Sequence, residues 1–506
     1  MNNFNPLRGL KPIFSLNIFK TNKDIFLLML GAFILVFFML NANVLWTAET
    51  RWASVCLEMQ LRGDYFHPYR YGIAYYDKPL LSYWLILFFA ALFHSFNEWA
   101  LRLPSAISGL IAVYCTFKLG TNLINRKTGL LAGWLLVTTY FFVFWSRTAT
   151  AEMMTVAGSM FAVLWYFEHK KNLSFKNYFI FFLITAVTSQ TKGLIGFTIP
   201  VLAIAADLFQ NKEWKKHLRL DFFVSLLLAT VIYLIPFGIS AYLPDVQSHS
   251  SGLSEVIREN FLRFFAPFDH KDPFFTYFIY LPVYVLPWTV LFIPAIVHAF
   301  VNWRKYNQNT RWLFKAASIL FLFFTISGSR RSYYVLPLVP FASLISANWI
   351  FLLKDKVNYR KFFDIAVKSI FVVYFLLFIW FGITYPIIDF KYYGNLKDFV
   401  KNVKSFALNK NVSWNQYQIL DYKSEDNRAI FYLKPEKPVL AVTDAELQQI
   451  FKNKKLQDKI IITTQENLAP FQNLIDRKSF IVIIENSKNK KENVAIFQAN
   501  NESKHL

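Results

Sequence analysis

Long apolar stretches, separated by short polar segments, occupy most of the chain between residues 25 and 386. A helix of about 20 apolar residues crosses the hydrocarbon core of a bilayer. We therefore predict a polytopic α-helical membrane protein with about eleven spans, and up to 13 as an upper bound. The expected spans lie at about 25–46, 104–121, 129–146, 153–167, 176–189, 193–209, 220–243, 274–300, 313–327, 333–353 and 363–385.

The apolar segment 80–96 is too short for a comfortable span. Counting it as one would also place the later basic loops on the wrong side of the membrane. We expect it to form a helix that lies in the outer interface. It closes a long first loop, residues 47–79, whose charged residues stand out in an apolar chain.

The basic N-terminal segment and the Lys- and Arg-rich loops between spans set the predicted orientation. Cytoplasmic loops are enriched in Lys and Arg, so the N-terminus is expected in the cytoplasm and the first loop outside. The run after the basic N-terminus is too long for a signal-peptide core and is interpreted as a retained first span. An odd number of spans then leaves the C-terminal part outside.

Residues 387–506 change character and predict a soluble α/β domain after a membrane domain of residues 1–386. Alternating apolar positions predict strands in QYQILDY, KPVLAVT, KIIITT, SFIVIIEN and NVAIFQA. The stretches LKDFVKNVKSF, DAELQQIFKN and ENLAPFQNLI are typical of helices. We expect this domain to be extracytoplasmic, and the long first loop, also extracytoplasmic, to carry juxtamembrane helices.

Composition supports the membrane interpretation. Only 17% of the residues are charged and mean hydropathy is +0.32, whereas soluble domains carry roughly 25% charged residues. A net charge of +22 is explained by topology and anionic headgroups, so no nucleic-acid partner is predicted. Two cysteines, Cys56 and Cys115, indicate neither a disulfide framework nor a metal site.

Ionisable residues at membrane depth are costly, and they are candidates for function. On the predicted outer face these are Glu49, Arg51, Asp77, Lys78, Glu152, Arg263, His270, Arg331 and Tyr334. One carboxylate can accept a proton from an incoming hydroxyl or amine. Lys and Arg suit a phosphate. This combination predicts group transfer from a lipid-phosphate donor at the membrane surface.

Each candidate also has a purely structural explanation. Glu49 could pair with an arginine of its own loop, and Glu152 could stabilise the N-terminus of its helix. Lys78 could reach the headgroups, Asp77 could only pair with Lys78, and Tyr334 could belong to an aromatic belt. The chain contains no P-loop, no GxGxxG after a strand and no HExxH. A nucleotide-driven pump and a zinc protease are therefore not expected.

The stretch from Ala48 to Trp84 resembles the first periplasmic loop of the lipid A aminoarabinose transferases. These enzymes stand with the protein O-mannosyltransferases in the GT-C glycosyltransferase superfamily. The segments NEWALRLPSAISGL, SRTATAEMM, TSQTKGLIGFTIP and SRRSYYVLPLVP resemble later motifs of the family in the same order. The resemblance covers about residues 30–350. One departure is clear, since the family's usual Asp-Glu pair is Ala48-Glu49 here.

The resemblance implies a polyprenyl-phosphate-linked sugar as donor and a site on the periplasmic face of the bacterial inner membrane. Glu49 and Glu152 would be the catalytic carboxylates. Lys78, Arg263, Arg331 and Tyr334 would bind the donor phosphate, and Asp77 and Arg51 would bind substrate. We predict no metal site, although a divalent cation is left open as a cofactor, because some relatives bind zinc.

The predicted function is that of a membrane glycosyltransferase with a lipid acceptor, such as lipid A, or a protein acceptor. Two alternatives stay open at this point. A transporter or flippase of lipid-linked sugars would show broken helices and charges at mid-membrane. A catalytically inactive scaffold would agree with the missing aspartate before Glu49. The sequence identifies neither the sugar nor the oligomeric state.

Overall fold

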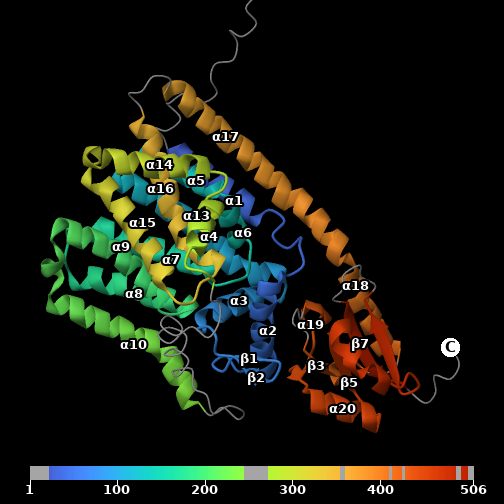
Figure 1. Cartoon of the computed structure of the whole chain (residues 1–506). Helices are drawn as coiled ribbons and strands as arrows, with labels where there is room; N and C mark the ends of the chain where they lie inside the picture. The colour runs from blue at the N-terminus through green and yellow to red at the C-terminus, as the bar shows by residue number, and fades with distance from the viewer. Residues whose placement is uncertain are drawn as a thin grey trace, which may run out of the picture.

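The structure is a computed structural model of the whole chain, and it describes residues 22–243, 272–353, 359–409, 413–423, 428–485 and 492–499. Most of these residues are helical, and the helices gather in one bundle (Figure 1). A five-stranded sheet built from the C-terminal residues lies beside one end of the bundle, next to the first loop (Figure 1). The candidate residues Arg263 and His270 lie outside the described residues.

Each apolar segment of the predicted membrane part contains helix. The bundle helices are α1 (Asn22–Phe37), α4 (Glu98–Leu123), α5 (Arg126–Val137), α6 (Tyr140–Ser146), α7 (Glu152–His169), α8 (Phe175–Lys192), α9 (Ile195–Asn211), α10 (Leu220–Tyr242), α13 (Thr276–Tyr284), α14 (Thr289–Asn302), α15 (Gln308–Ile326), α16 (Val339–Leu352) and α17 (Tyr359–Ile379). The mostly helical membrane fold that the sequence predicts is confirmed in this coarse form.

The predicted count of about eleven spans is not confirmed. By length and apolar composition alone, four helical stretches of the described residues could cross a membrane. They are Glu98–Leu123, Leu220–Tyr242, Ser332–Leu352 and Tyr359–Asn409. A fifth appears if α5 and α6 count as one span bent by 70°. The other helices are too short or too polar by the same measure. Helices α7, α8 and α15, with 18, 18 and 19 residues, are long enough but not apolar enough along their whole length.

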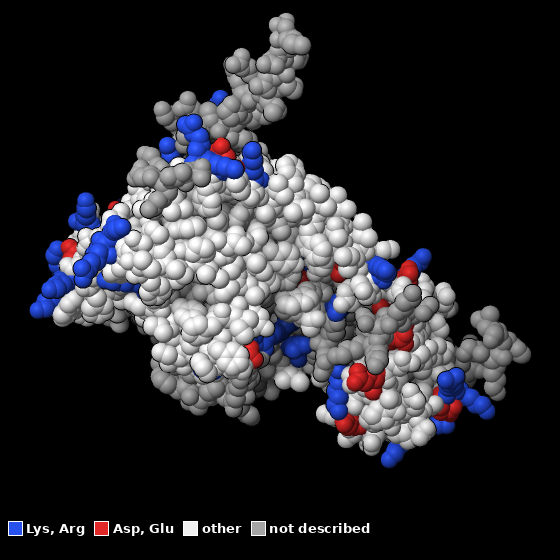
Figure 2. Space-filling view, turned by 45° about the horizontal axis from the view of Figure 1, so that its top comes forward, with Lys and Arg blue, Asp and Glu red and all other residues white. Residues whose placement is uncertain are grey.

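Polar contacts gather at one end of the bundle, and charged side chains are absent from the described part of the broad face beside it (Figure 2). At the end predicted to be cytoplasmic, the amide of Asn122 donates to Glu168 at 3.2 Å, and the amide of Asn309 donates to the Leu123 carbonyl at 2.7 Å. Lys and Arg side chains gather at this end of the bundle, and others lie in a recess beside the sheet (Figure 2). The broad face between these two places shows no charged side chains among the residues that the structure describes (Figure 2). Such an uncharged band agrees with a surface that faces lipid.

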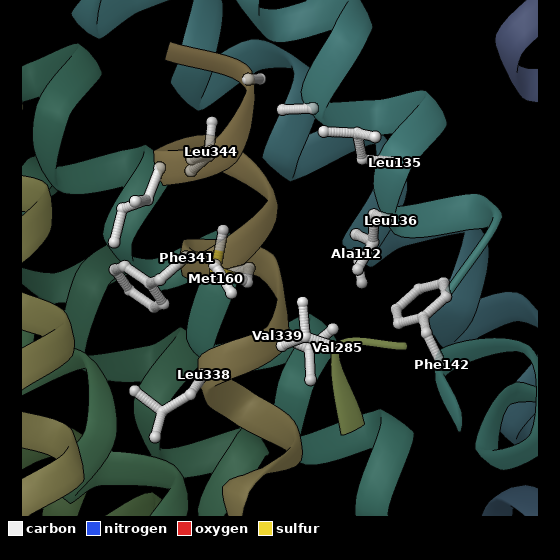
Figure 3. Close-up of a cluster of buried hydrophobic side chains, with 14 of the residues drawn as sticks. Ala112, Leu135, Leu136, Phe142, Met160, Val285, Leu338, Val339, Phe341 and Leu344 are labelled. Atoms are coloured by element: carbon white, nitrogen blue, oxygen red, sulfur yellow. The ribbon is translucent and has the colours of Figure 1, made fainter. Parts of the chain in front are cut away.

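The bundle core is apolar and close-packed, with Phe142, Met160 and Phe341 among its buried members (Figure 3). Gly120 of α4 and Gly129 of α5 allow these two helices to touch. A Cβ atom on Gly129 would lie 2.3 Å from the Phe117 carbonyl oxygen, and one on Gly120 would lie 2.8 Å from the Gly129 Cα. Small residues at such crossings let membrane helices approach closely.

The first loop forms a compact unit at the opposite end of the bundle. Helix α2 (Thr47–Arg62) ends at Gly63, whose φ of 66° suits the left-handed position after a helix. A short hairpin, β1 (Tyr69–Arg70) and β2 (Ile73–Ala74), follows it. Helix α3 (Leu81–Leu92) then occupies the segment predicted to be an interfacial helix. Trp52, Met59 and Tyr83 of this unit belong to a buried cluster that also contains Leu101 and Met154 of the bundle and Phe431 of the C-terminal part.

Helix α17 does not stop at the predicted domain boundary. One π-helical turn (Trp380–Thr384) connects it to α18 (Tyr385–Asn409), so the helix continues from the bundle to the sheet (Figure 1). The boundary at 386/387 therefore falls inside a continuous helical stretch. The amphipathic helix α18 buries Leu396, Phe399 and Val403 against the sheet. A change of composition marks where the helix changes its surroundings, and not where it ends.

A strand occurs in each of the five stretches where the sequence predicts one. They are β3 (Gln418–Asp421), β4 (Leu440–Ala441), β5 (Lys459–Thr464), β6 (Phe480–Ile484) and β7 (Asn493–Gln498), in the order β4-β3-β5-β7-β6. Strand β3 is parallel to β4 and β5, and β7 is antiparallel to β5 and β6.

Alternation along β5 divides the core of this part in two. Ile460 and Ile462 face the side covered by α18 and α19 (Arg428–Leu433), and Ile461 faces the side covered by α20 (Asp444–Asn453). The separate folding of these residues as a domain, and their side of the membrane, stay predictions.

Candidate functional site

The candidate site lies at the end of the bundle that carries the first loop. Ionisable side chains from segments far apart in the sequence meet there in three groups, and a recess with Lys and Arg at its surface opens between the helices and the sheet (Figure 2). Buried charges are costly unless they are paired, and each of these groups contains at least one ion pair.

The first group belongs entirely to the first loop. Asp77 lies 2.9 Å from the Lys78 ammonium and 3.3 Å from the Arg51 guanidinium, and it accepts a hydrogen bond from the Tyr75 hydroxyl at 3.1 Å. Burial, followed by the charge of Asp77, raises the pKa of the Tyr75 phenol, which keeps it protonated as a donor. The predicted residues Arg51, Asp77 and Lys78 are therefore brought together.

The second group joins three distant helices. Glu152, at the first position of α7, forms an ion pair with Lys192 at the end of α8. The Lys192 ammonium lies 4.7 Å from the ring centre of Tyr334, in the short helix η5 (Ser332–Leu338). Arg331 donates to the Tyr333 hydroxyl at 3.0 Å. Glu152 and Tyr334, both predicted, thus contact one lysine that the prediction did not include among the site residues. Predicted Arg331 binds Tyr333, whose ring centre lies 5.7 Å from the same lysine.

The third group is the most deeply buried. Glu49 is 2% exposed and Arg102 is 4% exposed. Nε and Nη2 of Arg102 donate to Oε1 and Oε2 of Glu49, each at 2.8 Å. The backbone N–H groups of Trp46 and Ala149 donate to the same carboxylate, both at 2.8 Å. Four donors therefore occupy the four lone-pair directions of Glu49.

Glu152 differs from Glu49 in this respect. In the part of the chain that the structure describes, Lys192 is its one hydrogen-bonding partner, and it binds Oε2. The other carboxylate oxygen is left with acceptor capacity. The two predicted carboxylates are therefore not equivalent, although both lie at the same end of the bundle.

Aromatic rings connect the second and third groups. The Trp46 and Trp145 rings meet edge to face at 5.8 Å, and the Trp145 ring lies 4.9 Å from that of Tyr333. No hydrogen bond or ion pair joins Lys78 to Glu49 or to Glu152 in the described segments. Those predicted residues that the structure describes thus lie at one end of the molecule, in neighbouring groups rather than in one cluster.

Two cavities border these groups. A small one of about 30 Å³ is lined by Glu49, Arg102 and Arg147, together with Phe381 and Tyr385 from the π-helical turn and α18. A larger one of about 320 Å³ is lined by Asp272, Arg330, Arg331, Ser332 and Tyr333. The second cavity is the more suitable in size and charge for part of an anionic ligand.

Sequence reasoning missed Arg102, Arg147 and Lys192. Each is a cation inside or next to an apolar stretch, which is a recognised signal of function or of a buried partner. Arg147, for example, donates to the carbonyls of Leu35 and Phe38 at 2.9 and 2.8 Å, at the end of α1. Among the described residues, no group of three His, Cys, Asp or Glu side chains could hold a metal ion.

Residues 77–239 match the family model described as dolichyl-phosphate-mannose-protein mannosyltransferase. The chain is 27% identical over 334 residues to the undecaprenyl phosphate-alpha-4-amino-4-deoxy-L-arabinose arabinosyl transferase of Yersinia pestis, a match covering 62% of this chain and 57% of that protein. A protein of Aquifex aeolicus is 26% identical over 336 residues, with 65% and 64% covered. The chain therefore spans less than two thirds of the length of these relatives.

Solved structures show the same fold over nearly the whole chain. ArnT from Cupriavidus metallidurans, bound to undecaprenyl phosphate, superposes with a TM-score of 0.72 at 15% identity, and 94% of this chain and 97% of that chain are covered. The chain resembles the GT-C membrane glycosyltransferases.

The oligosaccharyltransferase of Archaeoglobus fulgidus, tethered to an acceptor peptide, is a more distant member of this fold group. Its TM-score is 0.53 at 11% identity, and 91% of this chain and 72% of that chain are covered. At such low identities the likeness establishes the fold alone. The resemblance to the GT-C superfamily that the sequence motifs predict is confirmed, and the roles of the individual residues stay predictions.

Proposed function

We propose that this protein is a glycosyltransferase that moves a sugar from a polyprenyl-phosphate donor to a lipid or protein acceptor at the membrane surface. The observation that carries the proposal is the ArnT-like fold over 94% of the chain, with paired carboxylates and cations gathered at one end of its bundle. The match to an undecaprenyl-phosphate-dependent arabinosyl transferase supports the donor class. We place the site on the periplasmic face of a bacterial inner membrane, because the loops at the other end are the more basic ones.

The donor phosphate is proposed to bind among the cations of the first and second groups. Lys78, Arg331 and Lys192, with the Tyr334 hydroxyl, supply donors that a phosphate can use, and Arg263 is a further candidate outside the described residues. Asp77 and Glu152 form ion pairs with Lys78 and Lys192, two of these cations. Binding of a phosphate would exchange carboxylate partners for phosphate oxygens, which form charge-assisted bonds of the same kind. Arg51 and Asp77 would then contact the sugar.

For the transfer itself, we propose Glu152 as the general base. The acceptor hydroxyl or amine attacks the anomeric carbon of the sugar, its proton passes to the Glu152 carboxylate, and the anomeric carbon–oxygen bond breaks. The leaving polyprenyl phosphate takes the bonding electrons, and the cations stabilise its additional negative charge. Glu49, the other carboxylate predicted to be catalytic, has no free lone pair in the structure, and we propose that it acts by positioning α2.

A transfer assay with purified protein and a radiolabelled polyprenyl-phosphate sugar tests these roles. Glu152→Gln keeps the shape of the side chain and removes the base, so transfer should fall by roughly 10²- to 10⁴-fold. The matched control is Glu168→Gln, which makes the same change at the other end of α7, where Glu168 faces Lys118. Normal transfer by Glu152→Gln would contradict the assignment of the base.

Lys78→Ala tests the phosphate contact. We expect the donor concentration needed for half-maximal transfer to rise by about tenfold or more, because one charged hydrogen bond to phosphate is lost. Lys118→Ala, at the opposite end of the bundle, is the control. An unchanged donor requirement in Lys78→Ala would remove this residue from the phosphate site.

The same assay separates an enzyme from the two alternatives, and a vesicle assay for movement of the lipid-linked sugar separates those alternatives from each other. A flippase would move the lipid-linked sugar across vesicles without transferring it, and an inactive scaffold would do neither. Mass spectrometry of surface glycolipids and glycoproteins, with and without the gene, would identify the sugar and distinguish a lipid acceptor from a protein acceptor.

A further inference from the structure

The segment that leads into α2 is held by side chains from the C-terminal third of the chain. The N–H of Val44 donates to Oδ2 of Asp389 on α18 at 2.8 Å, and the N–H of Leu45 donates to the Tyr432 hydroxyl on α19 at 3.1 Å. The Tyr432 hydroxyl in turn donates to Oε1 of Glu98 at 2.8 Å. These contacts connect residues that are 345 and 387 positions apart in the chain.

Arg102 holds the carbonyl groups of the same segment. Its Nη1 donates to the Leu40 and Asn43 carbonyls at 2.7 and 3.1 Å, and its Nη2 donates to the Val44 carbonyl at 3.2 Å. The same guanidinium binds Glu49 in the first turn of α2. We name the four side chains that bind this segment, Glu49, Arg102, Asp389 and Tyr432, the α2 clamp. Asp389, like Glu49 and Arg102, is buried.

The far end of the first-loop unit is held as well. Glu58, near the end of α2, accepts the Val439 N–H at 2.7 Å, and the carbonyl of Tyr71 in the hairpin accepts the Ala441 N–H of β4 at 2.8 Å. The Tyr71 ring is buried among residues of α18 and the sheet. The C-terminal part therefore contacts the first-loop unit at both ends, between which Arg51 projects toward Asp77 and Lys78.

We propose that the C-terminal part of the chain positions the first loop for catalysis through the α2 clamp, with Tyr432 and Asp389 as its positioning residues. The proposal rests on the proposed glycosyl transfer, because the clamp fixes the helix that carries Glu49 and Arg51. The hydroxyl at position 432 serves two groups at once, the N–H of buried Leu45 and the partly buried Glu98 carboxylate. A phenylalanine would leave the Leu45 N–H and the Glu98 carboxylate without this partner, and α2 would lose one attachment.

Hydrogen–deuterium exchange of the full-length protein in nanodiscs tests the clamp without any substrate. In Tyr432→Phe, amide exchange around residues 44–50 should accelerate on the order of tenfold, since one hydrogen bond to a buried N–H is lost. Tyr422→Phe is the matched control, because the Tyr422 hydroxyl donates to Asp444 inside the C-terminal part at 3.1 Å. The control should leave exchange in residues 44–50 unchanged.

The second position gives an independent variant pair. Asp389→Asn keeps an oxygen that can accept the Val44 N–H and should exchange like the wild type, whereas Asp389→Leu should behave like Tyr432→Phe. Equal exchange in Asp389→Asn and Asp389→Leu would show that the hydrogen bond is not what holds the segment. Wild-type exchange around residues 44–50 in Tyr432→Phe would overturn the clamp altogether.

Kinetics decide whether the clamp serves transfer. In Tyr432→Phe, kcat per folded molecule should fall, or KM for the donor lipid should rise, by about tenfold. The midpoint temperature of thermal denaturation should be the same in Tyr432→Phe and in Tyr422→Phe. A residue that only supports folding would lower the amount of folded protein and leave kcat and KM unchanged, which would refute the positioning role. If the wild type transfers no sugar, the proposed function fails, and the exchange data still decide the clamp.

Discussion

The buried pair of Arg102 and Glu49 allows one prediction to be developed in detail. The Arg102 guanidinium makes two bonds to Glu49 and three to backbone carbonyls, at 2.7 to 3.2 Å. Arg102→Leu removes all five and leaves the Glu49 carboxylate buried without its cation. Removing one partner of a buried ion pair costs about 3–5 kcal/mol. Local opening around Glu49 should therefore become more frequent by roughly two to three and a half orders of magnitude.

The N–H groups of Trp46 and Ala149 report on this opening, because both donate to the Glu49 carboxylate. Their hydrogen exchange, followed in nanodiscs at pH 7, gives the free energy of local opening for each variant. Arg126→Leu is the matched control. It removes an arginine that binds buried Asp24 at 2.6 Å at the other end of the bundle, and it should leave both amides protected.

The double variant Arg102→Leu/Glu49→Gln decides whether the charge is responsible. A glutamine is neutral, and its side-chain oxygen can still accept an N–H, so the double variant should be more protected than Arg102→Leu alone. Such non-additivity is the signature of two directly interacting residues. If the double variant is as open as the single one, or more so, the unpaired charge of Glu49 is not the cost, and the reasoning fails.

Two further predictions concern packing and charge elsewhere in the chain. Gly129→Ala places a Cβ atom 2.3 Å from a backbone oxygen of α4, so the helices must separate at a cost of about 1–3 kcal/mol. Thermal denaturation in detergent should begin earlier, whereas Gly238→Ala, where a Cβ would meet nothing within 4 Å, should denature like the wild type. Lys454, the Lys478 N–H and the Ser479 hydroxyl lower the pKa of Asp476 from 3.8 to about 2. Because the pKa of Asp476 is lower in the folded state than in the unfolded state, this stabilisation is present above pH 3.8 and is lost as the pH falls toward 2. Asp476→Asn should therefore flatten the acid denaturation curve in that range. An unchanged curve would contradict the assignment.

Much of the secondary structure was predictable, because it depends on local pattern. Every apolar segment of the membrane part contains helix, and all five predicted strands are present. The turns inside those segments were not predictable. The 70° bend between α5 and α6 falls at Thr138 and Thr139, inside a segment predicted as one span. The continuation of α17 into α18 crosses a sharp change in composition. Hydropathy reports the surroundings of a residue, whereas bends depend on which neighbouring helix it packs against.

The candidate site was predictable where its members are close in sequence or match a motif. Arg51, Asp77 and Lys78 lie in one loop, and the structure joins them directly. The partner of Glu49 was not predictable, since Arg51 or Arg62 were nearer in sequence than Arg102. Lys192, which pairs with Glu152, falls between the expected spans 176–189 and 193–209. Its partner was not predictable, because a turn residue has no fixed partner until its helices are placed.

The sequence alone determined that this is a membrane protein of helices followed by alternating strands and helices, and that it resembles the GT-C glycosyltransferases. Burial of apolar side chains imposes those patterns locally, so they can be read without coordinates. Tertiary structure alone decided which charges meet. Glu49 binds Arg102, Glu152 binds Lys192, and Tyr432 reaches the segment before α2, because a buried polar group must find a partner wherever the fold places one.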